Sequence, residues 1–523
     1  MDLTKCVIGI ELGSTRIKAV LLDENNNIIA SGGHGWENKF ENGIWTYSIE
    51  DIHGGIQACY KDLKKDVKEK FGITITTVGA MGVSAMMHGY MPLDKDDNLL
   101  TPFRTWRNRI TPEASAELTE LFDFNIPQRW TISHIYQAIL NKEDHVKDIA
   151  YLPSLPGYTH YLLTGKKVTG ICEASAMLAA DSDTNDYDQG MCDKFDALVA
   201  SKGYDIKIRD IFPKVLVAGE DAGSLTPEGA KFLDPEGDLQ PGIPFCPPEA
   251  DAGTGMVATN SVRVHTGSIS AGTSDFVLIV LDKKLKRHRE VDVVSTPAGS
   301  NVALVQCNNC TSDINAWVQL FSEFAEAVGA DCNKEKLYPL LFKKALEGEV
   351  DAGGLISYNY FSGEGVTDIA NGCPLFVRRP DSNFTLANFM RMNLMSAIAT
   401  LKIGIDILKQ EEVKIASLYA HGGYFKTPEV GQRILSAAVN APVSVMESAG
   451  EGGAYGMALL AAYMLRKEPG ETLEDFLDNK VFATAKTSVV MADPSEVEGF
   501  ERFTENYKKA FPAERTAVEA LYC

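Results

Sequence analysis

The sequence predicts an α/β fold that is built twice and divided into two lobes. Residues 7–23 and 264–282 each read as a strand, a Gly with two hydroxyl residues after it, and a second strand ending in Leu-Asp. The copies lie 259 positions apart, about half of the 523 residues, and such an offset usually marks duplicated structural units. Strands alternating with helices indicate α/β architecture. Because residues 234–249 are rich in Pro and Gly, we expect lobes at 1–245 and 246–523.

Composition excludes several classes of partner. A net charge of −21 argues against nucleic acid and anionic membranes, because Lys and Arg supply most contacts to phosphate backbones. It does not argue against a small phosphorylated ligand, which needs only local donors. No apolar run reaches the roughly 18 residues of a membrane span, and the N-terminus lacks the features of a signal peptide. We therefore expect a cytoplasmic protein whose ten Cys are reduced, with Cys307 and Cys310 as packed thiols.

The first lobe continues from its hairpin as strand, helix and strand. A polar turn follows the hairpin, and residues 28–32 form the next strand. Residues 50–70 are expected to be helical, with one apolar stripe formed by Ile52, Ile56, Cys59, Tyr60, Leu63 and Val67. The apolar segment 78–87 is a strand that leads into His88 and Gly89.

The second lobe repeats this pattern after its own hairpin. Residues 387–408 form a long, mostly apolar helix, and 417–424 form a strand that runs into a Gly pair. A helix over 429–442 ends where Asn and Pro appear. A short strand over 441–447 and a small-residue helix over 451–465 complete the lobe.

The turn of the first hairpin is a candidate phosphate-binding site. Gly13 lets the backbone approach a phosphate, and consecutive N–H groups of a turn form a nest for anions. Ser14 and Thr15 add hydroxyl donors and Lys18 adds a cation, while Glu11 offers the oxygen ligands that Mg²⁺ prefers. The segment is not a Walker A loop, and a simple turn is the alternative.

The second copy strengthens this hypothesis, because a nucleotide held between two lobes needs donors from both. Gly272 and Thr273 match the first turn. Gly422 and Gly423 follow a strand, and their backbone could lie against adenine or ribose with no side chain to block it. A tight turn is the alternative interpretation of that Gly pair.

Asp251 is the candidate general base. It lies on a Gly-rich turn with Glu249 two residues before it, and such a carboxylate could take a proton from a substrate hydroxyl during phosphoryl transfer. The alternative is an N-cap for the helix over 252–256, since Asp is a favoured cap.

Two further segments are candidates for sugar binding. His88 stands at the end of a strand, where α/β proteins place their ligands, and its ring could bond a sugar hydroxyl. Trp106 and Asn108, within Trp-Arg-Asn-Arg, offer an aromatic face and polar groups. A core histidine and a surface loop are the respective alternatives.

Taken in order, these motifs resemble the FGGY carbohydrate kinases. The resemblance covers roughly residues 6–465, and its motifs are GIELGST, MHG, EADAGTG, SAGTS and HGGY. It implies a two-lobed, actin/hexokinase-like (ribonuclease H-like) duplicated fold with a central cleft. Glu11 stands where the family has Asp, and Ala252 follows the expected base where xylulokinases tend to have Asn.

The resemblance also implies roles for individual residues. Asp251 would be the general base, and Glu11 would be associated with Mg²⁺. The nucleotide and its phosphates would be bound by Gly13, Ser14, Thr15, Lys18, Gly272, Thr273, Gly422, Gly423 and Thr427. The sugar would be bound by Met87, His88, Trp106, Asn108 and Asp251.

The function implied by the resemblance is ATP-dependent, Mg²⁺-dependent phosphorylation of a small sugar. The MHG motif favours a ketopentose, with D-xylulose first and L-ribulose or another sugar or polyol as alternatives. A protein-acting ATPase of the actin or Hsp70 type and a sugar sensor without turnover are the other classes considered. The expected partners are sugar and ATP, without nucleic acid or membrane, and a homodimer is left open.

Overall fold

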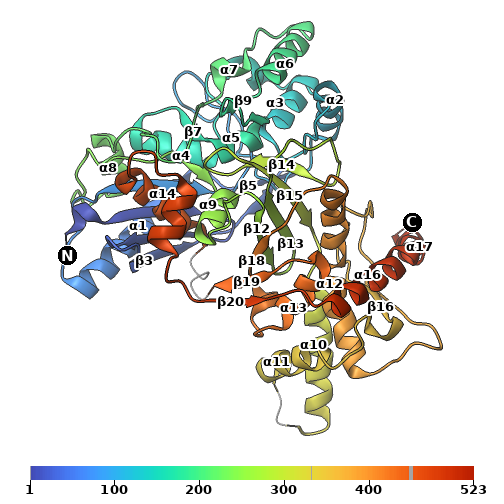
Figure 1. Ribbon diagram of the computed structural model, residues 1–523. Helices are drawn as coiled ribbons and strands as arrows, with labels where there is room; N and C mark the ends of the chain where they lie inside the picture. The colour runs from blue at the N-terminus through green and yellow to red at the C-terminus, as the bar shows by residue number, and fades with distance from the viewer. Residues whose placement is uncertain (1, 331–332, 447–451, 523) are drawn as a thin grey trace. The chain divides into compact units, whose positions relative to one another are not determined.

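The computed structural model describes residues 2–330, 333–446 and 452–522 and divides the chain into two units (Figure 1). The first unit comprises Met1–Arg263, Asp292–Val302 and Gly450–Thr484. The second comprises Val264–Val291, Ala303–Ala449 and Ala485–Cys523. Each unit has its own hydrophobic core.

The first unit is built around a sheet in the order β11-β6-β1-β2-β3. Its strands are β1 (Val7–Leu12), β2 (Arg16–Leu22), β3 (Ile28–Gly35), β6 (Ala80–Ala85) and β11 (Glu249–Ala250). The unit also contains the short strands β4 (Lys39–Glu41), β5 (Ile44–Thr46), β7 (Val168–Gly170), β8 (Ala180–Asp181), β9 (Asp186–Tyr187), β10 (Lys214–Leu216) and β14 (Asp292–Ser295). Its helices are α1 (Ile49–Phe71), α2 (Pro112–Phe122), α3 (Thr131–Leu140), α4 (Leu155–Thr164), α5 (Ile171–Met177), α6 (Gln189–Ser201), α7 (Ile208–Ile211), α8 (Pro227–Leu233), α9 (Asp251–Ala258), α14 (Gly452–Arg466) and α15 (Leu473–Phe476).

Helix α1 shows how local sequence sets an element of this unit. The side chain of Ser48 accepts a hydrogen bond from the amide of Asp51, which caps the N-terminus. Gly72 ends the helix with φ 69°, a left-handed conformation that favours Gly. The expected apolar stripe is buried, and α1 packs along β3 (Figure 1). The helix expected over 50–70 is therefore confirmed.

The second unit repeats the arrangement, with neighbouring strands in the order β15-β13-β12-β18-β19-β20. These are β12 (Thr266–Ala271), β13 (Asp275–Val280), β15 (Asn301–Cys307), β18 (Ser417–His421), β19 (Val443–Met446) and β20 (Thr487–Val490), with β16 (Ile356–Tyr358) and β17 (Leu375–Val377) as a separate pair. Its helices are α10 (Ser312–Ala327), α11 (Lys334–Ala345), α12 (Leu386–Gln410), α13 (Val430–Val439), α16 (Pro494–Lys509) and α17 (Phe511–Tyr522).

Strand pairing confirms the internal repeat. In the first unit, β1 pairs antiparallel with β2 and parallel with β6, and β6 pairs parallel with β11. In the second unit, β12 pairs antiparallel with β13 and parallel with β18, and β18 pairs parallel with β19. The two hairpins, 7–22 and 266–280, therefore occupy the same position in two similar sheets.

The division of the chain differs from the expected boundary at residue 245. Strand β11 pairs with β6, so the segment that carries Asp251 completes the first sheet instead of opening the second lobe. Helix α14 also returns to the first unit and packs against β1 and α9. The expected strand over 441–447 and helix over 451–465 are confirmed as β19 and α14, except at residues 447 and 451, which lie outside the described residues.

Candidate active site

Three neighbouring parallel strands of the first unit end at predicted site residues. Leu12 of β1 pairs with Ala85 of β6, and Ala85 pairs with Ala250 of β11. The chain leaves these strands at Gly13, at Met86 and at Asp251. Since parallel strands of an α/β sheet bind ligands beyond their carboxyl ends, the sheet brings the first phosphate turn, the MHG segment and the expected base to one edge.

Asp251 is the first residue of α9, and its side chain points to another segment of the chain. Oδ1 accepts a hydrogen bond from the amide of Met87 at 3.1 Å. The N-cap of the helix is Ala250, so Asp251 does not cap α9 as the alternative interpretation required. Desolvation by the surrounding protein raises the pKa of Asp251 to about 6. This carboxylate is therefore oriented and more basic than an ordinary Asp.

Glu11 lies on β1, opposite Lys18 of β2. Its Oε2 accepts a hydrogen bond from the amide of Ala454 at 3.2 Å. A Cβ at position 453 would stand 2.5 Å from Oε1, so α14 approaches this carboxyl closely only because Gly453 has no side chain. Desolvation, and then the negative charge of Asp251, raise the pKa of Glu11 to about 7. Two carboxyls that repel each other are a donor set that a divalent cation fits.

A second pair of carboxyls lies next to this edge, and sequence reasoning missed one of them. Oε2 of Glu249 accepts the amide of Glu173 at 3.3 Å, and Oε1 of Glu173 accepts the amide of His88 at 3.3 Å. Both side chains are buried. Desolvation raises the pKa of Glu249 to about 8 and that of Glu173 well above its usual range. Glu249 therefore favours the protonated form at neutral pH.

Both ring nitrogens of His88 are engaged inside the protein. Nε2 accepts a hydrogen bond from Nε of Arg129 at 2.9 Å, so the ring proton is on Nδ1, which faces the carbonyl of Ala176 at 3.5 Å. Burial and the charge of Arg129 hold the pKa of His88 well below its usual range. Its φ of 73° is left-handed, which is uncommon outside Gly. Sequence reasoning missed Arg129, because nothing near position 129 points to His88.

Trp106 and Asn108 belong to a loop that packs on the first core. Trp106 is partly buried against that core. The side-chain amide of Asn108 forms two hydrogen bonds with the main chain of Trp45. Oδ1 accepts from the main-chain N–H of Trp45 at 2.9 Å, and Nδ2 donates to the carbonyl of Trp45 at 2.8 Å. Contact of Trp106 and Asn108 with a sugar stays a prediction.

Aromatic side chains fix the first phosphate turn through its main chain. Nε1 of Trp36 donates to the carbonyl of Gly13 at 2.7 Å, and the Tyr47 hydroxyl donates to the carbonyl of Ser14 at 2.5 Å. The amide of Gly13 donates to the carbonyl of Arg16 at 3.1 Å. Thr15 is exposed at the tip of the turn. The turn is thus held through its carbonyls while its tip faces outward.

The second unit brings its expected nucleotide residues together in the same way. Ser270 of β12 pairs with His421 of β18, so the turn at Gly272 and the Gly pair follow neighbouring parallel strands. Gly422 has φ 107°, and a Cβ there would lie 2.3 Å from the carbonyl oxygen of Ala271. Only Gly fits this position. Thr273 and Gly423 are exposed, whereas Thr427 is buried.

A buried acid lies under the second turn. Asp275 opens β13 and is fully buried. Desolvation, and then the charge of Glu364, raise its pKa well above the usual range. Cys307 and Cys310 are buried free thiols, which confirms their expected role as packed residues.

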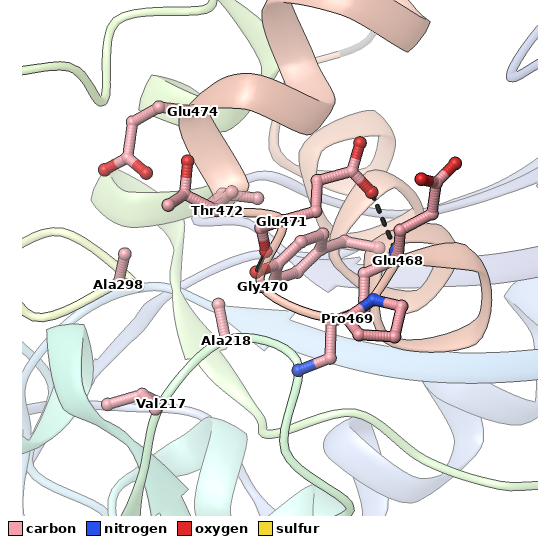
Figure 2. Close-up of a pocket in the computed structure, with 12 residues that line it drawn as sticks. Val217, Ala218, Ala298, Glu468, Pro469, Gly470, Glu471, Thr472 and Glu474 are labelled. Carbon is pink, nitrogen blue, oxygen red and sulfur yellow. Dashed lines mark hydrogen bonds between the residues drawn. The ribbon is translucent and has the colours of Figure 1, made fainter.

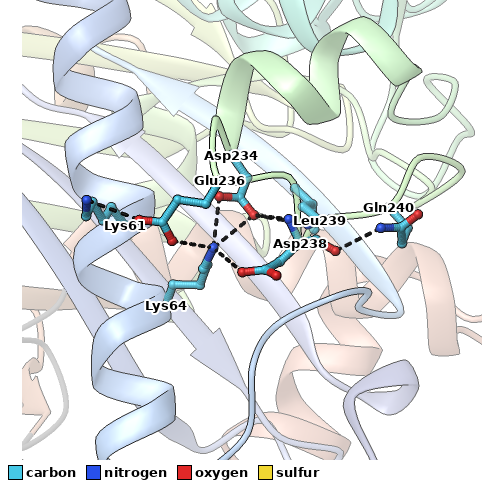
Figure 3. A network of polar contacts seen from close by, with 7 residues as sticks. All are labelled: Lys61, Lys64, Asp234, Glu236, Asp238, Leu239 and Gln240. Carbon is cyan, nitrogen blue, oxygen red and sulfur yellow. Dashed lines mark hydrogen bonds and ion pairs between the residues drawn. The ribbon is translucent and has the colours of Figure 1, made fainter.

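Two cavities of the first unit involve other residues. One, of about 640 Å³, is lined by Val217, Ala218, Ala298, Tyr463, Lys467 and the loop 468–474 (Figure 2). The other, of about 570 Å³, is lined by residues that include Lys64, Glu236 and Asp238. Figure 3 shows the ion pairs that Lys64 forms with these two acidic residues. None of the predicted site residues lines either cavity. Within the described parts of the chain, no helix has the length and apolar character that crossing a bilayer requires.

Comparison with known proteins gives the family. The model of the FGGY carbohydrate kinase N-terminal domain matches residues 6–255, and that of the C-terminal domain matches residues 267–465. The chain belongs to the FGGY family of carbohydrate kinases. It is therefore a sugar kinase, as the resemblance implied, and not a protein-acting ATPase.

Individual relatives of the kinase differ in the substrate that they are named for. A xylulose kinase from Haemophilus influenzae is 23% identical over 96% of this chain and 98% of its own. Solved structures of a ligand-bound xylulose kinase and of a gluconate kinase, both from Lactobacillus acidophilus, are each 19% identical and cover 99% of both chains, with TM-scores of 0.78 and 0.79. These structures confirm the two-domain, actin/hexokinase-like α/β fold.

Proposed function

We propose that the kinase transfers the γ-phosphoryl group of ATP to a hydroxyl of a small neutral sugar, with the ketopentose D-xylulose as the first candidate. The observation that carries the proposal is the environment of Asp251. Its carboxylate is oriented by the Met87 amide, is made more basic by desolvation, and lies at the sheet edge that also carries the first phosphate turn. The xylulose kinase relative supports the choice of sugar.

In the proposed reaction, ionised Asp251 accepts the proton of the attacking hydroxyl. The sugar oxygen forms a bond to the γ-phosphorus as the bond to the β–γ bridging oxygen breaks, and ADP leaves with that electron pair. Assistance of this kind typically contributes 10²–10⁴-fold to the rate. Positioning of the nucleophile and stabilisation of charge supply most of the remainder.

The first phosphate turn has the groups needed to bind phosphate oxygens. Ser14 and Thr15 offer hydroxyls and main-chain amides, and Lys18 offers a cation. In the second unit, Gly272 and the exposed Thr273 form a turn of the same kind, next to Gly422 and Gly423. The proposed nucleotide contacts of each unit therefore come from loops that follow parallel strands.

The residues of the first unit fit an Mg²⁺ ion whose coordination is completed by water and substrate phosphates. Among the described residues, no group of three or more His, Cys, Asp and Glu side chains is arranged to hold a metal ion. Mg²⁺ is usually bound by one or two carboxylates together with water and substrate phosphates. Glu11 would hold the ion, which when bound neutralises charge on the phosphates.

The test is an ADP-release assay over ketopentoses, polyols and sugar acids. The proposal predicts turnover with D-xylulose or a closely related ketose, and L-ribulose or a polyol as best substrate would identify one of the alternative kinases. Binding of sugar without ADP release from any member of the panel would contradict the proposal and indicate a sensor.

A further inference from the structure

The ring of His88 leaves no free nitrogen for a substrate, so another group must contact the sugar next to it. Its Nε2 is taken by Arg129 and its Nδ1 faces a carbonyl. A sugar hydroxyl could bond this ring only by displacing the guanidinium. The neighbouring charged group, Arg129, is therefore the better candidate for contact.

The guanidinium of Arg129 is fixed on two sides and open on the third. Its Nε donates to His88, and its Nη2 forms an ion pair with the carboxylate of Asp292. Nη1 donates to no acceptor in the part of the chain that the structure describes, and the side chain is 22% exposed. A guanidinium held in this way presents two oriented N–H groups.

A chain of contacts links this donor to the expected base. His88 directly follows Met87, whose amide holds the carboxylate of Asp251. Asp292, only 12% exposed, is itself held by the side-chain amide of Asn125 at 2.8 Å. All these residues belong to the first unit.

Asp292 also sets the net charge of the site around Arg129. The ion pair cancels the positive charge of Arg129, and burial keeps His88 neutral. A neutral, donor-rich site suits hydroxyl groups, whereas an uncompensated guanidinium would favour a carboxylate.

We propose that Arg129 binds a hydroxyl of the substrate through Nη1, with His88 as its positioning residue, and that Asp292 makes the site selective for neutral sugars over sugar acids. This inference rests on the proposed function. It adds the substrate class, neutral sugars, and the pair of residues that selects this class, Arg129 and Asp292.

Two single variants and their combination test the inference, with D-xylulose and D-gluconate as substrates. Arg129→Gln is expected to raise KM for D-xylulose about 10–100-fold and to leave KM for ATP unchanged, because a hydrogen bond from a charged donor is lost. Asp292→Asn is expected to raise the ratio of kcat/KM for D-gluconate to that for D-xylulose at least tenfold. In Arg129→Gln/Asp292→Asn, which lacks both charges, the ratio should return toward the wild-type value.

Asp186→Asn is the matched control, because Asp186 pairs with Arg209 in the same unit and neither residue contacts His88. It should leave the ratio unchanged. The inference would be overturned if Asp292→Asn kept the wild-type ratio of kcat/KM for D-gluconate to that for D-xylulose. It would also be overturned if Arg129→Gln raised the KM for D-xylulose and the KM for ATP equally. If Asp292→Asn fails to fold, Arg129→Gln and the double variant still decide it. Absence of turnover by the wild type with every neutral sugar would instead refute the proposed function.

Discussion

The amide of Met87 donates a hydrogen bond to Oδ1 of Asp251 across 164 positions of sequence. This contact joins the MHG segment to the expected base, and β6 and β11 make it possible by ending side by side. The orientation of the base therefore depends on the segment that also positions His88 and Arg129. Substitutions in the MHG segment should therefore affect catalysis, as should substitutions in the segment that carries Asp251.

The pH dependence of activity should follow the ionisation of Asp251. Desolvation raises its pKa to about 6, and only the ionised carboxylate can accept a proton. We expect kcat/KM for the sugar to be constant above pH 7 and to fall about tenfold per pH unit below about pH 6. A profile measured from pH 5 to 8 tests this, and constant activity down to pH 5 would contradict it.

Glu249→Gln should change how stability depends on pH. Since the folded-state pKa of Glu249 is raised to about 8, the folded protein keeps a proton that the unfolded chain has lost above about pH 4.5. This group therefore makes the wild type lose stability as pH rises from about 5 to 8, whereas Gln has no proton to lose. Urea unfolding should show the variant gaining roughly 2–5 kcal/mol on the wild type between pH 5 and 9. A difference that does not change with pH would refute this explanation.

Gly422→Ala should destabilise the protein, and Gly423→Ala should not. At position 422 the backbone is left-handed and a Cβ would meet the carbonyl oxygen of Ala271 at 2.3 Å, whereas a Cβ at 423 meets nothing within 4 Å. We expect a loss of about 2–4 kcal/mol for the first variant and less than about 0.5 kcal/mol for the second. Urea denaturation measures both values, and equal losses would show that the close approach to Ala271 is unimportant.

Lys64→Met should cost far more stability than Lys61→Met. Lys64 is buried and pairs with Asp234, Glu236 and Asp238, whereas Lys61 is exposed and, among the described residues, pairs with Glu236 alone (Figure 3). Removing Lys64 leaves the buried carboxylate of Asp234 without its cation, at a cost of about 3 kcal/mol. The exposed pair of Lys61 contributes less than about 1 kcal/mol. Comparable unfolding midpoints for the two variants would contradict the structural role of Lys64.

Local patterns in the sequence predicted most of the elements. The two Gly-hydroxyl hairpins predicted the repeat, and apolar periodicity predicted α1 and α12. The boundary was misplaced because β11 has only two residues and is recognisable only by its pairing with β6. Helix α14 likewise gives no sequence signal that it returns to the first unit.

The site residues that sequence reasoning missed are those positioned by distant segments. Arg129 and Glu173 contact the ring and the amide of His88, 41 and 85 positions away. No spacing rule connects such residues, because loops of arbitrary length separate them. The roles of the motif residues came from the family resemblance, and the structure adds which of their atoms are already engaged.

The most direct test of the account is the turnover of Asp251→Asn. Asn keeps the acceptor oxygen for the Met87 amide but cannot take up a proton at neutral pH. The account predicts a 10²–10⁴-fold lower kcat, with ATP and sugar affinities by calorimetry within about threefold of wild type. A kcat close to the wild-type value, with binding intact, would contradict the role of Asp251 as the base.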